Sequence, residues 1–64
     1  MYSAKIMKSV KIGGGEVREV IKSSRSIDLS ALIDTYECYY KSDGISIRIY
    51  DLSNQQRKLV YQDG

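Results

Sequence analysis

The hydrophobic residues of this 64-residue chain follow two different periods, and the points where the period changes constrain the fold more than any other feature. Over residues 2–12, and again over residues 45–50, apolar and polar side chains alternate, as they do in a strand with one buried face. Over residues 29–41 the apolar side chains recur every three or four positions, as on one face of a helix. The chain is therefore predicted to combine strands with one helix.

The middle of the chain predicts a helix over residues 29–41. Its apolar stripe contains Leu29, Leu32, Ile33, Tyr36 and Tyr40. Ser26 or Asp28 is placed to cap the first turn by accepting a hydrogen bond from a free backbone N–H. Asp43 and Gly44 end the helix, because Gly44 readily takes the left-handed backbone conformation of a cap or turn.

The segment before the helix is less regular. Met7 and Lys8 interrupt the alternation of residues 2–12, which predicts either a bulge or an exposed strand end near them. The three glycines at 13–15 suit a tight reversal of the chain. Residues 16–23 fit either a second strand or a short helix, and their β-branched side chains favour the strand, which would complete a hairpin. Residues 23–26 are interpreted as a polar connector.

The segment after the helix predicts a second hairpin. Ile45, Ile47 and Ile49 form the apolar face of one strand, and residues 53–56 predict a loop. The last strand is expected over residues 57–62, with Leu59 and Tyr61 on one face and Lys58 and Val60 on the other. The fold class is therefore α+β: one small domain over residues 1–64, with an antiparallel sheet of about four strands, one helix packed on one face, and the order β-β-α-β-β.

Side chains with catalytic or metal-binding chemistry are scarce. Cys38 is the one thiol and the chain has no His, so neither a Cys–His pair nor a zinc site is available. The glycines at 13–15 lack the Lys-Ser or Lys-Thr ending of a phosphate-binding loop, and Glu16 after them would repel a phosphate. We expect no enzyme activity, no catalytic residue, no metal site and no cofactor.

Nothing in the sequence indicates a membrane or a secreted protein. No apolar run approaches the roughly 18 residues of a membrane span. Residues 1–12 lack the apolar block of a signal peptide, and one cysteine cannot form an internal disulfide. We expect a cytoplasmic protein with no membrane partner.

The chain has six tyrosines and no other aromatic residue, and tyrosine is enriched at protein interfaces. Tyr36, Tyr40 and Tyr61 are expected to fill the core in place of the absent Phe and Trp. Four residues fall outside the predicted core stripes: Met7, Tyr39, Tyr50 and Leu52. We expect these four to bind a larger protein, which this non-enzymatic module would modulate or inhibit. Its size is typical of accessory proteins of phages and mobile elements. A homodimer is also expected, because pairing would bury apolar surface that one helix cannot cover.

The distribution of charge suggests an alternative ligand. Residues 1–26 hold six Lys or Arg and two Glu, a net charge of +4, whereas residues 27–52 hold two Lys or Arg and five acidic residues, a net charge of −3. Such a segregation is often only a solvated surface. The alternative function is a small nucleic-acid-binding regulator that uses the basic N-terminal hairpin, with Lys5, Lys11 and Arg48 contacting phosphates.

Overall fold

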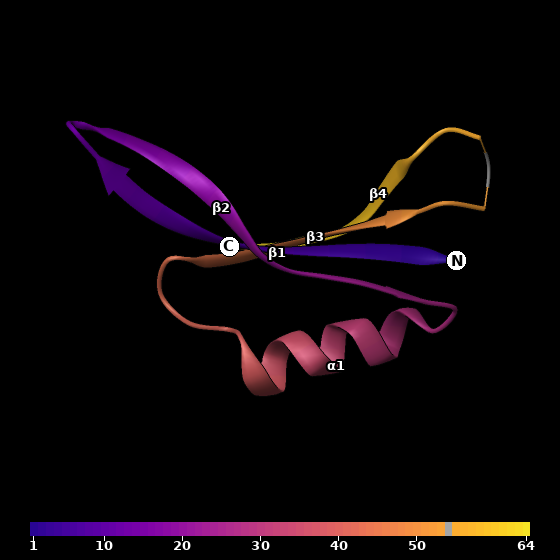
Figure 1. Ribbon diagram of the computed structural model, residues 1–64. Coiled ribbons are helices and arrows are strands. Elements are labelled where there is room, and N and C mark those ends of the chain that lie inside the picture. The colour runs from indigo at the N-terminus through magenta and orange to yellow at the C-terminus, as the bar shows by residue number, and fades with distance from the viewer. Residues whose placement is uncertain (54) are drawn as a thin grey trace.

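A computed structural model describes residues 1–53 and 55–64, and its elements follow the predicted order β-β-α-β-β (Figure 1). The elements are β1 (Tyr2–Ile12), β2 (Gly15–Ser26), α1 (Leu29–Tyr39), β3 (Ile45–Asp51) and β4 (Lys58–Asp63). The strands form one antiparallel sheet in the order β2-β1-β3-β4. The predicted α+β fold class is therefore confirmed.

The helix is capped as the sequence predicts but ends two residues earlier. Asp28 is the N-cap, and its Oδ1 accepts hydrogen bonds from the backbone N–H groups of Ser30 and Ala31 at 3.0 and 3.4 Å. The helix ends at Tyr39, not at residue 41. Gly44 has a φ of +81°, so it takes the left-handed conformation that the turn into β3 requires.

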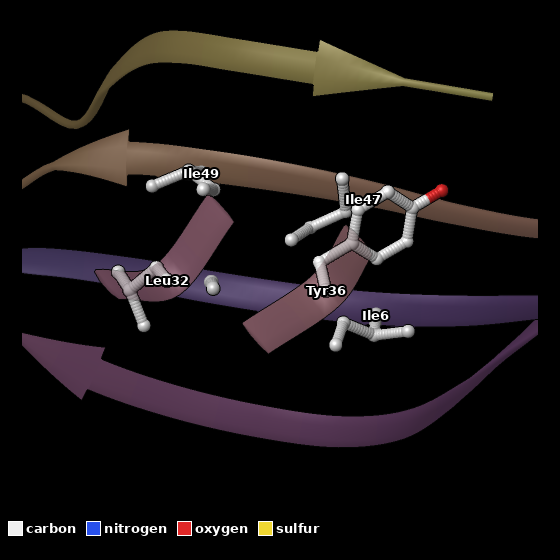
Figure 2. Close-up of a cluster of buried hydrophobic side chains, with 6 residues drawn as sticks. Ile6, Leu32, Tyr36, Ile47 and Ile49 are labelled. Atoms are coloured by element: carbon white, nitrogen blue, oxygen red, sulfur yellow. The ribbon is translucent and has the colours of Figure 1, made fainter. Parts of the chain in front are cut away.

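The core lies between α1 and the β1–β3 pair (Figure 2). Its buried residues are Ala4, Ile6, Leu32, Tyr36, Ile47 and Ile49. Leu29, Ile33 and Tyr40 pack around them, which confirms the predicted helix stripe. An 11-residue helix is only about 16 Å long, whereas a strand of the same number of residues spans about 36 Å. The tip of the β1–β2 hairpin therefore projects past the helix (Figure 1), and Ile12 there is 63% exposed.

The second segment of the chain is a strand, so of the two alternatives for residues 16–23 the hairpin is confirmed. The interpretation of residues 23–26 as a connector was wrong, because β2 continues through Ser26. The predicted bulge exists, but it lies in β2: Ile6 pairs with Lys22 and Met7 with Val20, so Ile21 is the extra residue. A bulge reverses which side chains of its strand face the helix.

A second irregularity changes the prediction for β4. Tyr61 lies opposite Ile49 on the helix side of the sheet, whereas Leu59 lies opposite Tyr50, and Val60 is the extra residue between them. The expectation that Leu59 and Tyr61 share a face was therefore wrong. The predicted loop at residues 53–56 includes Asn54, which lies outside the described residues.

Candidate functional site

No helix or strand of residues 1–53 and 55–64 covers the face of the sheet opposite α1, and we call this face the open face. Because Ala4, Ile6, Ile47 and Ile49 point into the core, the alternate residues of β1 and β3 point away from the helix. The strand pairings extend this face to β2 and β4. Its residues are Ser3, Lys5, Met7, Ser9, Lys11, Glu16, Arg18, Val20, Ser23, Arg25, Ser46, Arg48, Tyr50, Leu59 and Gln62.

The open face holds many cations and only one carboxylate at its strand positions. It holds six of the ten Lys and Arg residues: Lys5, Lys11, Arg18, Arg25, Arg48 and Arg57, the last through its contact with Tyr50. All four arginines of the chain are in this set. Glu16 is the one acidic residue at its strand positions, and it lies opposite Lys11. The near-neutral net charge of +2 therefore conceals a strongly basic surface.

Two cations face each other at the centre of the open face. Lys5 of β1 and Arg48 of β3 are direct cross-strand partners, and like charges in that position destabilise a sheet. The Nε atom of Arg48 is buried and has no hydrogen-bond partner among the described residues. A buried donor left without an acceptor also costs free energy. Such local costs are typical of surfaces kept for binding rather than for stability.

One aromatic ring lies beside these cations. The guanidinium carbon of Arg57 is 5.1 Å from the centre of the Tyr50 ring, a cation–π contact. Tyr50 is half-buried, and its cross-strand partner on β1 is the small residue Ser3, which is only 7% exposed. The result is a flat aromatic and guanidinium surface next to Lys5 and Arg48.

The helix side of the molecule has the opposite charge. Seven of the eight acidic residues lie on the helix, in the loops or on the helix side of the sheet, together with four lysines and no arginine. Lys41 and Asp63 form an ion pair there at 3.4 Å.

The backbone N–H of Ser53 donates to Asp51 Oδ1 at 2.8 Å, and this hydrogen bond holds the pKa of Asp51 below its ordinary value.

The residues predicted to bind a protein are not on one surface. Met7 and Tyr50 share the open face. Leu52 follows the last residue of β3, and its backbone N–H donates to the Met1 carbonyl at 2.9 Å. Tyr39 is on α1, on the other side of the sheet, and is 81% exposed. In contrast, the three residues predicted to bind nucleic acid, Lys5, Lys11 and Arg48, all lie on the open face.

Three further cations of this face were missed from the sequence: Arg18, Arg25 and Arg57. Arg18 and Arg25 are seven residues apart, and in a regular strand an odd separation puts two side chains on opposite faces. The extra residue in β2 returns Arg25 to the face of Arg18. The interrupted alternation near Met7 was a signal of this bulge, but the sequence does not show in which strand the extra residue sits.

Other kinds of site have little support within residues 1–53 and 55–64. No group of three or more Cys, Asp and Glu side chains there is arranged to hold a metal ion. Cys38 is exposed on the helix. Among the same residues, no helix is both long and apolar enough to span a bilayer.

Comparison with known proteins adds no relative from which a function could be carried over. Neither a protein-family model, nor a curated protein, nor a solved structure matches this chain. The open face is therefore interpreted from its own geometry and charge.

Proposed function

We propose that this protein is a non-enzymatic module that binds single-stranded nucleic acid across the open face of its sheet. The observation that carries the proposal is the collection of all four arginines on one face that has a single acidic residue at its strand positions. A surface of this charge attracts a polyanion, and the arginine guanidinium group binds phosphate through two parallel hydrogen bonds.

Phosphate contacts explain the central pair of cations. Lys5 and Arg48 repel each other when the face is empty, since they are direct cross-strand partners. A phosphate placed between them would turn this repulsion into two attractive contacts. Arg18 and Arg25 on β2 extend the basic surface across the sheet, along a path that a flexible backbone can follow.

Stacking favours a single strand over a duplex. The Tyr50 ring and the Arg57 guanidinium are planar groups on which an unpaired base can stack, and the bases of a duplex are not available for this. A duplex is usually read by an element that enters a groove. The helix α1 lies on the other side of the sheet, with Asp34 and Glu37 exposed on it.

A protein partner is the second candidate function. Val20 is 50% exposed on the open face and lies opposite Met7, whereas Leu59 is 44% exposed and lies opposite Tyr50 near the other end, so the face also has apolar side chains at two places. A larger protein with an acidic surface could occupy it and be modulated or inhibited. Nucleic acid is preferred because cations outnumber the apolar side chains and because the arginines are gathered there.

Two lysines of β1 provide a matched test. Lys5 is on the open face, and Lys8 is on the helix side of the same strand, so both changes to Ala remove one positive charge from β1. Binding is measured by fluorescence anisotropy with a labelled oligothymidylate of about 16 nucleotides. We expect Lys5→Ala to weaken binding about three- to tenfold at low salt and to reduce the slope of log K against log salt by about 0.7. Lys8→Ala should change neither.

Three results would contradict the proposal. If both variants lose the same affinity, the open face is not the binding surface. If a duplex of the same sequence binds as tightly as the single strand, stacking is not involved. If no nucleic acid binds at low salt, the protein-partner candidate replaces this one.

A further inference from the structure

The outer edge of the sheet at β2 is long and mostly exposed. β2 has 12 residues, and all of them except Ser24 and Ser26 are exposed. The helix comes close to the C-terminal part of β2, where Lys22, Ser24 and Ser26 line a pocket together with Ala31, Leu32 and Thr35, whereas residues 15–21 of β2 remain exposed. The edge strand contains no proline to prevent pairing with another strand. An edge of this kind can pair with a further strand through its free backbone groups.

We propose that two copies of this chain pair antiparallel through β2, around a two-fold axis that passes between Val20 and Ile21. Side chains that oppose each other in a ladder must lie on the same face of the sheet. In a regular strand this condition would put a residue, not a peptide bond, on the axis. The bulge at Ile21 reverses the alternation of side chains along β2. A residue before the bulge therefore opposes a partner residue on the same face of the sheet only when the axis lies between two residues of the strand.

In this register the charges of β2 are complementary to themselves. Glu16 faces the partner's Arg25 on the open side of the sheet, and Glu19 faces the partner's Lys22 on the helix side. Each pair occurs twice by symmetry. Glu16 and Glu19 already lie opposite Lys11 and Lys8 of their own chain, so each carboxylate would lie between two cations. Val20 and Ile21, 50% and 43% exposed, would be buried at the axis.

Neighbouring registers lack this complementarity. A shift of two residues in one direction sets Arg18 against the partner's Arg25, which is repulsive. A shift of two in the other direction puts Glu16 opposite Ser23 and Glu19 opposite Val20, without a cation for either. The charges therefore select one register and one partner, a second copy of this chain.

The pairing would join the two sheets into one of eight strands. Because the axis is perpendicular to the sheet, both helices lie on one side and both open faces on the other. The inference does not depend on the proposed function, but it would double the basic surface.

A mixing experiment tests the pairing. In a dimer of the Glu19→Lys variant, positions 19 and 22 that face each other would both hold cations. In a dimer of the Lys22→Glu variant they would both hold anions, so each variant should repel its own copies. The mixture restores both pairs, because each Lys then faces a Glu. Sedimentation equilibrium should show a dimer for the natural chain, dimerisation weakened about tenfold or more in each variant alone, and a restored dimer in the mixture. Glu37→Lys, on the helix, is the matched control and should dimerise like the natural chain.

A cross-linking experiment tests the register. Arg18 faces the partner's Ser23, so the double variant Arg18→Cys with Ser23→Cys, made together with Cys38→Ser, should form a covalent dimer on oxidation. Within one strand these two positions are about 17 Å apart and cannot bridge. The double variant Arg18→Cys with Arg25→Cys, also made with Cys38→Ser, should cross-link much less.

The outcomes are distinguishable from a failure to fold, because circular dichroism reports the fold of every variant. A natural chain that stays monomeric up to about 1 mM would overturn the proposal. A dimer that survives in both single variants, or that is not restored in the mixture, would place the interface elsewhere.

Discussion

At the scale of single residues, Tyr36 is the largest of the fully buried side chains, and it carries an ionisable group. Its side chain is 1% exposed, and its hydroxyl donates to the Ile45 carbonyl at 3.4 Å. Burial raises the pKa of Tyr36 above its ordinary value of 10.0, and the nearby carboxylate of Asp63 adds to the rise. The folded protein therefore favours the neutral phenol more strongly than the unfolded chain does.

The sign of the pH effect follows from the linkage between ionisation and folding. The contribution of Tyr36 to stability is fully present below pH 10.0 and is lost as the pH rises towards the raised pKa of the folded state. We expect Tyr36→Phe to flatten the fall in the urea midpoint above pH 10.0. Tyr39→Phe, at an exposed position, should keep the alkaline dependence of the natural chain. An unchanged dependence in Tyr36→Phe would show that another group causes the alkaline loss.

At the scale of elements, the β1–β2 hairpin depends on the backbone of its turn. Gly13 and Gly14 have φ angles of +54° and +90°, both in the left-handed region, as in the two-residue turns that match the twist of antiparallel strands. The neighbouring Gly15 starts β2 and has no positive φ. Of the three glycines, two are therefore required by conformation and one is not.

This difference predicts unequal effects of alanine. Gly14→Ala should destabilise the protein by about 1–2 kcal/mol, because a Cβ is unfavourable in left-handed backbone. Gly15→Ala should be close to neutral, since the added Cβ would lie 3.6 Å from the Ile12 carbonyl oxygen, an ordinary contact. Denaturant unfolding of the two variants measures both values. Equal losses would mean that the turn conformation is not what these glycines provide.

At the scale of the whole molecule, stability rests on six buried residues. A 64-residue chain has little core to lose, because small domains bury a small fraction of their surface and have a free energy of unfolding of only a few kcal/mol. Several large apolar side chains lie beyond the helix instead, among them Ile12 and Val17 near the hairpin tip. The number of apolar residues in the sequence is therefore larger than the number that builds the core of this protein.

A pair of isoleucines tests this distinction. Ile49 is completely buried and Ile12 is 63% exposed. We expect Ile49→Ala to cost about 2–5 kcal/mol, which leaves the protein largely unfolded at 25 °C, whereas Ile12→Ala should cost less than about 0.5 kcal/mol. Thermal unfolding followed by circular dichroism compares them. A large loss from Ile12→Ala would mean that the hairpin tip is covered in solution.

The amino-acid sequence by itself determines the elements and their order. The alternation of Ile45, Ile47 and Ile49 and the helical spacing of Leu29, Leu32 and Tyr36 each reflect a local period. The cap at Asp28 and the turn at Gly44 depend on a few neighbouring residues, so they too are readable along the chain. Lys5 and Arg48 could be assigned to the open face for the same reason.

The tertiary structure alone settles the composition of that face. Where an extra residue enters β2 or β4 depends on how the strand pairs with its neighbour, and this pairing is a relation between distant segments. The bulge at Ile21 brings Arg25 to the side of Arg18, and the bulge at Val60 separates Leu59 from Tyr61. Because one inserted residue reverses every later side chain, a local period cannot predict a face beyond it. The gathering of the arginines on one surface is therefore a property of the folded sheet.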